Sequence, residues 1–437
     1  MYLCTDNRTQ QMGKWTILRQ RIHEYWLYYY GYRLMLSRQR RFIKELQQRD
    51  VIKVVFVALN VSMWKYQGIY DLLAADSRFQ VFVVLSPGIT YKPEQRLRDL
   101  QQMRDYFGSR KMAYVDWDLE HDAPAFDIRR ELNPDIIFYM QPYHGSYHDR
   151  HCFLHFTDRL IAYSPYSYLQ VHVPYNYDNV LQNVAWRNYY VSRYHLTEAQ
   201  VLARNRGVNA VAVGYTSADV YQQNQYREVW RDADHTRRRL IWAPHCTLAN
   251  DGTAFSRSNF LMMADFMVQL AERYQDQLQI AFKPHPGLLT ELYMHPEWGK
   301  EKADAYYDRW RNMPNTQLAD GEFVNLFQGS DAMVHDSGSF VVDYLYFQKP
   351  VMYVSQDIQR AKSYANIPGQ QAYDAHYIGR TCDDVAHFVE HIVLSGQDTM
   401  QARRQTFYQE FLAQPGGQST AQNIYQDIIH QLCKQSS

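Results

Sequence analysis

Two short stretches of the chain hold side chains suited to binding a phosphate. The first is His335-Asp336-Ser337-Gly338-Ser339, a polar turn between an apolar strand predicted over 332–334 and a helix predicted over 340–347. A turn of small residues that opens a helix offers backbone N–H groups, hydroxyls and the positive end of a helix dipole to an anion. The alternative is an ordinary crossover between two strands, whose turn is polar because turns face water.

The second stretch, Lys283-Pro284-His285-Pro286, follows a buried strand predicted over 280–282. The two prolines hold His285 in a non-helical backbone just beyond the strand, and Lys283 brings a cation beside it. In open parallel sheets, ligands bind outside the carboxyl ends of the strands, which is where both stretches lie. We therefore expect Lys283 and His285 to meet the same anion as Ser337 and Ser339.

A third group of reactive side chains follows a strand predicted over 135–140. His144, His148, His151 and His155 are spaced by four, three and four residues, a helical spacing that could place metal ligands on one face. However, His144 directly follows a strand end and a proline, which favours a loop, and no carboxylate stands where a zinc hydrolase needs one. A neutral imidazole in that loop is suited to taking a proton from an attacking hydroxyl, and a structural histidine that caps the loop is the alternative.

Two acidic pairs fit the bare DxD pattern that holds a divalent cation in metal-dependent glycosyltransferases. They are Asp116-Trp117-Asp118 and Asp232-Ala233-Asp234, and both lie outside the predicted phosphate pocket. We therefore expect transfer without a metal or other cofactor. No GxGxxG follows the first predicted strand, and neither a P-loop nor a GxSxG elbow occurs, which disfavours dinucleotide-binding, kinase and hydrolase functions.

The elements that position these residues alternate regularly. From residue 53 onward, strands are predicted over 53–59, 80–86, 111–115 and 135–140, with helices over 66–74, 93–107 and 125–132. This alternation predicts a parallel sheet with helices on both faces, so residues 51–225 are expected to form a Rossmann-like domain. Its less regular second half contains predicted helices over 180–190 and from Thr197 to Asn205, with Thr197 as the N-cap, and a strand over 209–213.

The polar run from Tyr221 to Arg238 lacks apolar periodicity, and we expect the interdomain connection there. A second domain, residues 239–437, then opens with a strand that leads into Pro244 and His245. A long helix over 257–274, the two phosphate-binding stretches, and closing helices from Asp383, Met400 and Thr420 are predicted to complete it.

The N-terminal segment, residues 1–50, is predicted to be a basic amphipathic helix. Its aromatic-rich stripe alternates spacings of three and four and comprises Trp15, Leu18, Ile22, Tyr25, Tyr29, Tyr32 and Leu36. Between residues 14 and 44 there are eight lysines and arginines and one acidic residue, Glu24, which gives a local charge of about +7. Such a helix suits the surface of an anionic membrane, and the alternative is packing on its own domain or on a second subunit of a homo-oligomer. Because the first strand starts at residue 53, we expect a chain beginning near Arg49 to fold.

Composition limits the class of protein further. The 437 residues suit two domains, and the 46% hydrophobic and 21% charged residues indicate a globular protein. Forty-six basic and 46 acidic residues cancel, so nothing in the overall charge indicates a nucleic-acid partner. The five cysteines show no regular spacing, and no signal peptide or apolar run of membrane-spanning length occurs, which predicts a cytoplasmic protein with reduced thiols.

Together, the Lys-Pro-His-Pro stretch and the later polar turn resemble the CDP-glycerol glycerophosphotransferase family of teichoic-acid and capsule synthesis. In that family, a Lys-x-His-Pro motif and a Thr-Asp-Tyr-Ser-Ser motif line the nucleotide-donor pocket of a GT-B fold. The first motif matches in full at residues 283–286, whereas the second keeps only Asp336 and Ser339. Tyr143-His144-Gly145 stands where the family has Trp-His-Gly, whose histidine is thought to act as a base. Ala243-Pro244 also matches, but His245-Cys246-Thr247 replaces a threonine, an aromatic residue and an arginine.

The resemblance implies an α/β transferase of GT-B architecture, with two Rossmann-like domains whose parallel sheets face a central cleft. The first domain would hold the acceptor and the second the nucleotide donor, and the final helix or two would cross back to the first domain. It implies that His144 and His285 are catalytic. The groups expected to bind the donor phosphate and nucleotide are Lys283, His285, Pro244, His245, Asp336, Ser337, Gly338 and Ser339.

The expected reaction moves a glycerophosphate or related polyol-phosphate unit from a CDP-activated donor, such as CDP-glycerol, to a lipid-linked or glycan acceptor. The protein would then be cytoplasmic and peripheral at the inner face of the cell membrane, with its N-terminal helix on anionic lipid. One alternative is a GT-B glycosyltransferase that uses a UDP-, GDP- or CDP-sugar. Another is an inactive member that binds nucleotide or glycan within a polymer-synthesis complex.

Overall fold

The computed structural model describes residues 14–118, 123–124, 126–222, 225–248, 258–321 and 323–433. The chain divides into two compact units. The first comprises the described residues of Met1–Leu169, Val173–Ser217 and Gln414–Ser437, and the second comprises those of Gln170–His172 and Ala218–Ala413. The second unit therefore ends at Ala413 and not at residue 437, because the closing segment belongs to the first unit.

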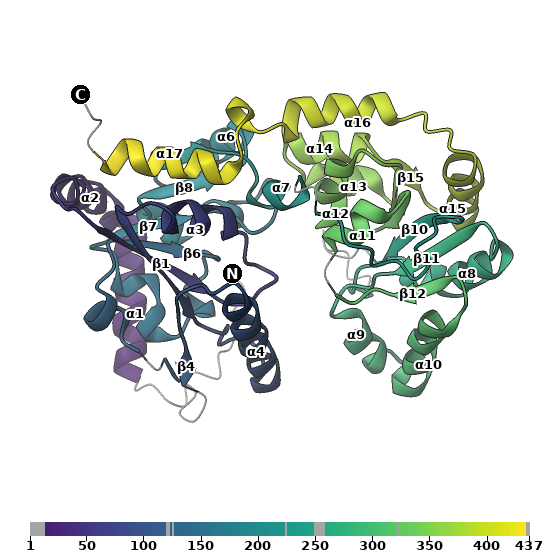
Figure 1. Ribbon diagram of the computed structural model, residues 1–437, viewed down its shortest axis with the longest axis horizontal. Helices are drawn as coiled ribbons and strands as arrows, with labels where there is room; N and C mark the ends of the chain where they lie inside the picture. Colours follow the sequence, from purple (N-terminus) through teal and green to yellow (C-terminus); the bar gives the residue numbers. More distant parts are fainter. Residues whose placement is uncertain are drawn as a thin grey trace. The chain divides into compact units, whose positions relative to one another are not determined.

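The first unit is built on a seven-stranded parallel sheet with the order β3-β2-β1-β6-β7-β8-β9 (Figure 1). Its strands are β1 (Ile52–Ala58), β2 (Phe79–Leu85), β3 (Tyr114–Val115), β6 (Ile136–Tyr139), β7 (Leu160–Tyr163), β8 (Arg187–Tyr190) and β9 (Ala210–Ala212). A separate antiparallel pair consists of β4 (Trp117–Asp118) and β5 (Ala123–Pro124). Successive strands are added outward from β1 to β3 on one side and then from β6 to β9 on the other. The topological switch point therefore lies at the carboxyl ends of β1 and β6.

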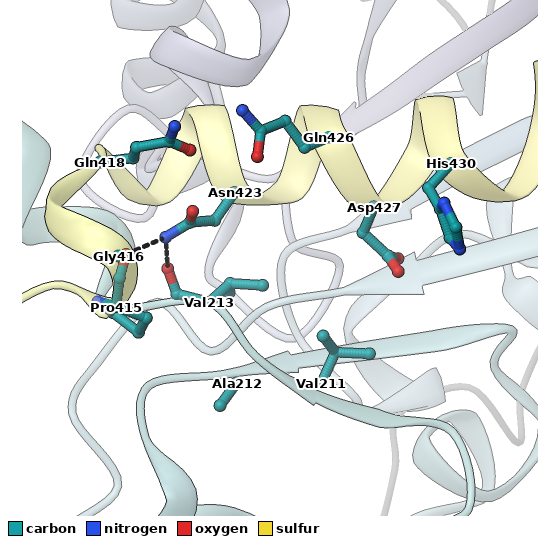
Figure 2. Close-up of a pocket in the computed structure, with 10 residues that line it drawn as sticks. All are labelled: Val211, Ala212, Val213, Pro415, Gly416, Gln418, Asn423, Gln426, Asp427 and His430. Carbon is teal, nitrogen blue, oxygen red and sulfur yellow. Dashed lines mark hydrogen bonds between the residues drawn. The ribbon is translucent and has the colours of Figure 1, made fainter. Parts of the chain in front are cut away.

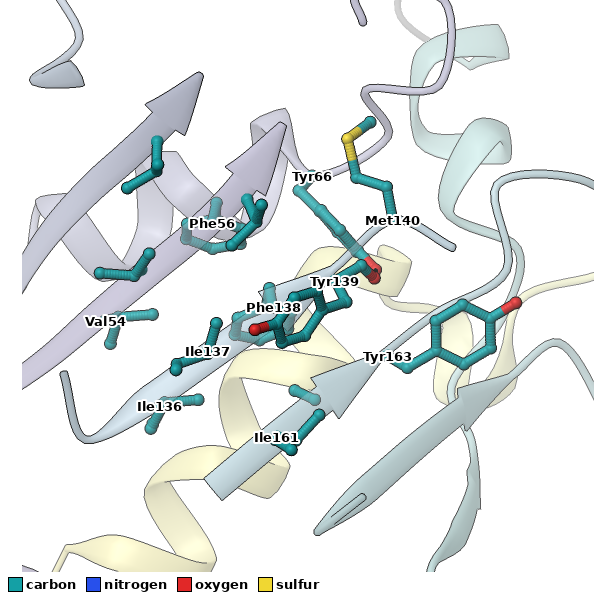
Figure 3. Packing of buried hydrophobic residues seen from close by; sticks show 14 of the residues in the cluster. Val54, Phe56, Tyr66, Ile136, Ile137, Phe138, Tyr139, Met140, Ile161 and Tyr163 are labelled. Carbon is teal, nitrogen blue, oxygen red and sulfur yellow. Dashed lines mark hydrogen bonds between the residues drawn. The ribbon is translucent and has the colours of Figure 1, made fainter. Parts of the chain in front are cut away.

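The central strands form because their residues can be buried on both faces of the sheet. From Val54 to Ala58 every side chain is fully buried, as is every side chain of β6. In register, Val54 pairs with Ile136 and Val57 with Tyr139. Figure 3 shows these aliphatic and aromatic side chains packed beside Tyr66. The Tyr66 hydroxyl donates to the Tyr139 carbonyl at 2.8 Å and accepts from the Ser164 N–H at 2.9 Å, which ties the carboxyl ends of β6 and β7 together.

Helices pack against the first sheet. They are α3 (Gln67–Ala74), α4 (Pro93–Ser109), α5 (Val180–Val184), α6 (Arg193–Leu202), the short η3 turn (Ile128–Leu132) and α17 (Thr420–Leu432). The last of these contacts α3 and packs Ile424 and Ile428 into the core of the first unit (Figure 1). No helix among the described residues is both long and apolar enough to cross a membrane.

The N-terminal helix is present and runs from Lys14 to Leu46 as α1 (Lys14–Trp26), a wider π-turn (Leu27–Gly31) and α2 (Tyr32–Leu46). Its buried residues recur every three or four positions and join the core of the first unit: Leu27, Gly31, Met35, Gln39, Phe42 and Leu46. The helix therefore packs on its own domain through this stripe. The predicted aromatic stripe lies mostly elsewhere, and its members Leu18, Ile22, Tyr25 and Tyr29 are exposed.

The second unit repeats the same plan with a six-stranded parallel sheet in the order β12-β11-β10-β13-β14-β15. Its strands are β10 (Arg238–Ala243), β11 (Leu278–Phe282), β12 (Thr316–Leu318), β13 (Ala332–His335), β14 (Val351–Val354) and β15 (Tyr377–Gly379). This is the doubly wound order of Rossmann folds, with its switch point between β10 and β13. The predicted fold class, two Rossmann-like domains of GT-B type, is confirmed.

Helices alternate with these strands. They are α8 (Phe260–Arg273), α9 (Leu288–Met294), α10 (Gly299–Asn312), α11 (Val324–Gly329), α12 (Phe340–Asp343), α13 (Ile358–Ser363), α14 (Ile367–Asp374), α15 (Cys382–Phe388) and α16 (Gln401–Phe407), with α7 (Thr216–Tyr221) at the junction of the units. The predicted connection over 221–238 belongs to the second unit, where Trp230 is buried and Arg239 pairs with Glu228. The start of the helix predicted over 257–274 lies outside the described residues.

Two helix predictions in the first unit were wrong. The helix predicted over 180–190 ends at Val184, and residues 187–190 form strand β8 instead. Buried amides terminate α5, because Asn188 Nδ2 donates to the Gln182 carbonyl and Asn209 Nδ2 donates to the Ala185 carbonyl. The helix predicted to start at Thr197 begins at Arg193, and the Thr197 hydroxyl bonds back to the Arg193 carbonyl at 3.3 Å.

Candidate functional site

In the first unit, His144 follows β6 at the switch point of the sheet, in a single 3₁₀ turn (His144–Ser146). Its loop is held on both sides: the Tyr147 N–H donates to the His144 carbonyl at 3.1 Å, and the Ser146 hydroxyl donates to Gln141 Oε1 at 2.8 Å. The ring of Tyr143 stacks on Tyr175 at 4.8 Å between centroids. His144 Nε2 lies 3.1 Å from Glu24 Oε1 of the N-terminal helix, and the His144 side chain is 45% exposed. The imidazole is thus fixed and accessible to a substrate.

In the second unit, three loops meet at the carboxyl ends of neighbouring strands. Residues 244–246 follow β10, residues 283–287 follow β11, and residues 336–339 follow β13. The His285 N–H donates to the Pro244 carbonyl at 3.0 Å, and the His245 N–H donates to Asp336 Oδ1 at 2.6 Å. The sequence placed two of these loops at the carboxyl ends of strands, the family resemblance added residues 244 and 245, and the structure brings all three loops together at the switch point of the sheet.

His245 and His285 form the centre of this cluster. Their ring centroids are 4.7 Å apart with an interplanar angle of 52°. The Gly287 N–H donates to His285 Nδ1 at 3.1 Å, and the Thr247 N–H donates to His245 Nδ1 at 3.3 Å. A ring nitrogen that accepts a hydrogen bond carries no proton, so in the neutral rings the proton sits on Nε2. Burial lowers the pKa of His285, which keeps that ring neutral near pH 7. The His285 ring can therefore donate an N–H to a phosphate oxygen, and the His245 ring lies beside it.

The same region contains a set of candidate metal ligands. One ligand atom from each of His245, Cys246 and His285 lies within 4.8 Å of the others, and this is the only such trio found among the described residues. A metal on Nε2 would require the proton to move to Nδ1, where it would meet the backbone N–H groups that now donate there. Burial also raises the pKa of the Cys246 thiol, which disfavours the thiolate that metals prefer. The hydrogen bonds thus fit an anion better than a metal.

Asp336, predicted to bind the donor, is buried and holds the loops together instead. Its carboxylate accepts from the His245 N–H and, at 2.5 Å, from the N–H of Asn259, which precedes α8. Burial raises its pKa to about 6 despite these hydrogen bonds. A carboxylate with this function repels a phosphate but fixes the backbone that carries His245. Sequence reasoning missed Asn259, because nothing in its local pattern indicates a partner so distant in the chain.

Lys283, the second predicted phosphate ligand, is also turned inward. Its side chain is largely buried, and Nζ donates to the Gly321 carbonyl at 3.0 Å and lies 3.4 Å from that of Ala319. The ammonium therefore anchors the loop after β12. Its charge still lies one residue from the Pro284-His285 turn, so it contributes a positive field there rather than a direct contact.

The polar turn after β13 offers hydroxyls from one buried and one exposed serine, Ser337 and Ser339. The Gly338 carbonyl accepts a hydrogen bond from Gln170, which belongs to the same unit. The helix that follows is shorter than predicted, because α12 gives way to a 3₁₀ turn at Tyr344. His335 supports the turn from inside: Nδ1 lies 3.1 Å from the Ser337 carbonyl and Nε2 lies 3.3 Å from His376 Nε2.

Among the described residues, neither the histidines after β6 nor the two DxD pairs gather into a group that could hold a metal ion. His155 contacts Asp149 at 3.0 Å, and His151 is buried against Trp117. These two histidines therefore have partners different from that of His144. In the two DxD patterns, Asp116 pairs with Arg104 at 2.9 Å and Asp232 pairs with Arg237.

An open pocket of about 530 Å³ lies where α17 meets β9 (Figure 2). Asn423 donates to the carbonyls of Val213 and Pro415, and Asp427 accepts from Arg187 and Tyr189. None of the predicted site residues lines this pocket. Its polar side chains dock the returning helix, so we assign it no role in the reaction.

The comparison with protein families gives one decisive match. The model of the CDP-glycerol:poly(glycerophosphate) glycerophosphotransferase family matches residues 166–430, more than half of the chain. The chain belongs to this family. It is therefore a transferase, and the resemblance inferred from residues 283–286 and 335–339 is confirmed. No curated protein sequence matches the chain.

Solved structures show the same fold at low sequence identity. A putative UDP-N-acetylglucosamine 2-epimerase from Listeria monocytogenes is 14% identical with a TM-score of 0.54, covering 87% of this chain and 96% of its own. A further UDP-N-acetylglucosamine 2-epimerase is 12% identical with a TM-score of 0.55, covering 88% and 96%. The wall teichoic acid polymerase TagF, in a histidine variant soaked with CDPG, is 12% identical with a TM-score of 0.52, covering 96% and 100%. These likenesses support the fold alone.

Proposed function

We propose that this glycerophosphotransferase-family protein transfers a glycerophosphate unit from CDP-glycerol to a hydroxyl of a lipid-linked or glycan acceptor in cell-wall polymer synthesis. The observation that carries the proposal is the pair of adjacent imidazoles, His245 and His285, whose ring centroids are 4.7 Å apart and whose Nδ1 atoms each accept a backbone N–H. Two N–H donors beside the Ser337–Ser339 turn suit a diphosphate. The solved TagF structure that was soaked with CDPG supports this choice of donor.

In the proposed reaction, His144 takes the proton of the acceptor hydroxyl. The acceptor oxygen attacks the phosphorus that bears the glycerol, a new P–O bond forms, and the bond to the bridging oxygen breaks. CMP departs with that electron pair. Hydrogen bonds from His245, His285 and the serines of the turn stabilise the charge that develops on the leaving phosphate, so the transfer needs no metal.

The donor can be identified by measuring binding and turnover together. We expect CDP-glycerol to raise the melting temperature of the protein more than CDP-ribitol or UDP-N-acetylglucosamine at equal concentration, because ligand binding to the folded state stabilises it. CMP release should then require both CDP-glycerol and an acceptor. Stabilisation by a nucleotide sugar alone would favour the glycosyltransferase alternative, and binding without turnover would favour an inactive member.

Metal independence is a separate part of the proposal. Treatment with EDTA should leave the rate of CMP release within about twofold, because no step needs a cation. Complete loss of activity that manganese, magnesium or zinc restores would contradict it and would return attention to His245, Cys246 and His285.

A further inference from the structure

Glu24 is the only acidic residue between Lys14 and Lys44, in a segment otherwise rich in arginine. Its carboxylate meets His144 at 3.1 Å. The Glu24 side chain is 21% exposed, whereas the adjacent residue, Tyr25, is 59% exposed. The one negative charge between Lys14 and Lys44 thus lies on the side that faces the domain, against the imidazole at the switch point of the sheet.

The contact joins two elements that are each held in place. One helical turn after Glu24, the Tyr28 hydroxyl donates to Asp178, and the Arg204 guanidinium lies 4.4 Å from the centroid of the Tyr28 ring. Leu27 and Gly31 are buried in the same turn. Residues four apart on a helix share a face, so anchoring Tyr28 also orients Glu24 toward the domain.

On the other side, the His144 ring cannot drift far, because its loop is tied by Ser146 and by the Tyr143–Tyr175 stack. The arrangement therefore does not depend on two mobile surface side chains, which is the usual reason that exposed ion pairs contribute little. A fixed carboxylate next to a fixed imidazole has a defined chemical consequence.

An ionised carboxylate only accepts hydrogen bonds, so the proton of the neutral His144 ring sits on Nε2 and the lone pair is on Nδ1. Nδ1 is then the atom that can take a proton from the acceptor. When it does, the ring becomes positively charged, and a neighbouring carboxylate stabilises that charge, as in serine-protease triads.

We propose that Glu24 is a positioning residue for the transfer reaction: the N-terminal helix supplies the carboxylate that sets the tautomer of His144 and stabilises its protonated form. This inference rests on the proposed role of His144 as the base. It gives the N-terminal helix a function in catalysis that is independent of any membrane contact.

Three variants of the full chain test the inference: Glu24→Ala, Glu24→Gln and the control Glu45→Ala. Glu45 is an exposed acidic residue on the same helical run. We expect Glu24→Ala to lower kcat roughly ten- to hundredfold, a part of the roughly 10²- to 10⁴-fold that general-base catalysis contributes, with the KM for CDP-glycerol unchanged. Glu24→Gln keeps an oxygen acceptor and should recover part of the loss. Glu45→Ala should match the wild type, and all three should melt as the wild type does.

A spectroscopic measurement separates this inference from the proposed function. In ¹⁵N-histidine-labelled protein, with the His144 signals assigned through His144→Gln, the neutral ring should be in the Nε2–H form. It should become a mixture of tautomers in Glu24→Ala and stay unchanged in Glu45→Ala. If His144→Gln keeps full activity, the proposed base is wrong, and the inference falls with it even where Glu24 fixes the tautomer. If Glu24→Ala has wild-type kcat, or the tautomer does not change, Glu24 is only a structural contact and the inference is overturned.

Discussion

Asp336 matches a donor-site motif, but its side chain holds the surrounding loops in place. Its carboxylate is buried and accepts the backbone N–H groups of His245 and Asn259. The hydrogen bonds connect the loop after β13 to the loop after β10 and to the start of α8. In the proposed donor site, the side chains left to contact a phosphate are His245, His285 and the serines, so the Asp336 carboxylate would shape the site without touching the ligand.

The first prediction concerns these contacts. His285→Ala and Ser339→Ala should each weaken CDP-glycerol binding or slow transfer about tenfold or more, which corresponds to about 1.4 kcal/mol, because each removes a hydrogen bond to a charged phosphate. Steady-state kinetics of CMP release measures both effects. His387→Ala, an exposed histidine of α15, is the matched control and should behave as the wild type. Normal kinetics in both site variants, with normal folding, would place the donor elsewhere.

The second prediction follows from the pKa of Asp336, which burial raises from 3.8 to about 6. Between these two values the folded protein holds a proton that the unfolded chain has lost, so Asp336 makes the folded state less stable as the pH rises. One pKa unit equals about 1.36 kcal/mol, so the effect reaches about 3 kcal/mol above pH 6.

Urea unfolding at pH 4, 5, 6 and 7 can isolate this effect by comparing the wild type with Asp336→Asn, in which the other titrating groups are unchanged. The free energy of unfolding of the wild type, minus that of the variant, should fall as the pH rises from 4 to above 6. A difference that increases with pH would mean that the hydrogen bonds to the carboxylate outweigh its burial.

At the scale of elements, the sequence predicted the central strands well because they are apolar runs buried on both faces. The strand predicted over 332–334 falls within β13, and that over 280–282 falls within β11. Prediction failed where tertiary contacts decide: residues 187–190 joined the sheet, and α5 ended early, because the partners of its last carbonyls are side chains of Asn188 and Asn209. No local pattern shows such partners.

The candidate site was predictable to the same degree. Strand ends and prolines placed His285 and Ser339 at a ligand-binding edge, and His144 in a loop. The side chain of Lys283 points toward the carbonyls of residues 319 and 321. This orientation could not be predicted, because the sequence is the same whether a lysine after a strand points into the protein or toward a ligand. The same holds for the contact between Glu24 and His144, whose residues are far apart in the chain.

The third prediction corrects the expectation that the N-terminal helix is dispensable. A chain beginning at Arg49 lacks Leu27, Met35, Phe42 and Leu46, all buried in the core of the first unit. Burying one large aliphatic side chain contributes roughly 1.5–3 kcal/mol, and a typical domain is stable by only about 5–15 kcal/mol. We therefore expect this chain to unfold or to melt at a much lower temperature in circular dichroism.

A chain beginning at His23 is the matched control, because it loses the exposed residues Leu18, Arg19, Arg21 and Ile22 and keeps both Leu27 and Glu24. It should melt close to the full-length protein. Should the shorter chain beginning at Arg49 melt normally, the buried stripe would not contribute to folding and the packing of α2 would be incidental.

At the scale of the whole molecule, the two units repeat one topology, and the reactive residues follow the switch points of both sheets. His144 follows β6 in the first sheet, while residues 244–246 follow β10 and residues 336–339 follow β13 in the second. Any α/β domain of this order concentrates loops there, so the positions follow from topology and only the side chains are specific to this family.

The last prediction concerns membrane attachment, which the overall charge of the molecule cannot provide. The chain carries 46 basic and 46 acidic residues, so any attraction to anionic lipid must be local. The outer face of the N-terminal helix is the candidate, because its large apolar and aromatic side chains stay exposed: Leu18 is 47%, Ile22 59%, Tyr25 59% and Tyr30 63% exposed. Exposed Arg19 and Arg21 lie among them. Aromatic rings flanked by arginines suit the headgroup region of an anionic membrane.

We expect the full-length protein to cosediment with vesicles that contain phosphatidylglycerol, but not with pure phosphatidylcholine vesicles, and to dissociate as salt is raised. Each basic residue near such a surface contributes about 1 kcal/mol, so the double variant Arg19→Gln, Arg21→Gln should bind roughly thirtyfold more weakly. The control pair Arg98→Gln, Arg130→Gln removes the same charge from exposed positions outside the helix and should bind normally. Equal binding by both double variants, or no binding by the wild type, would overturn the assignment of this face to a membrane.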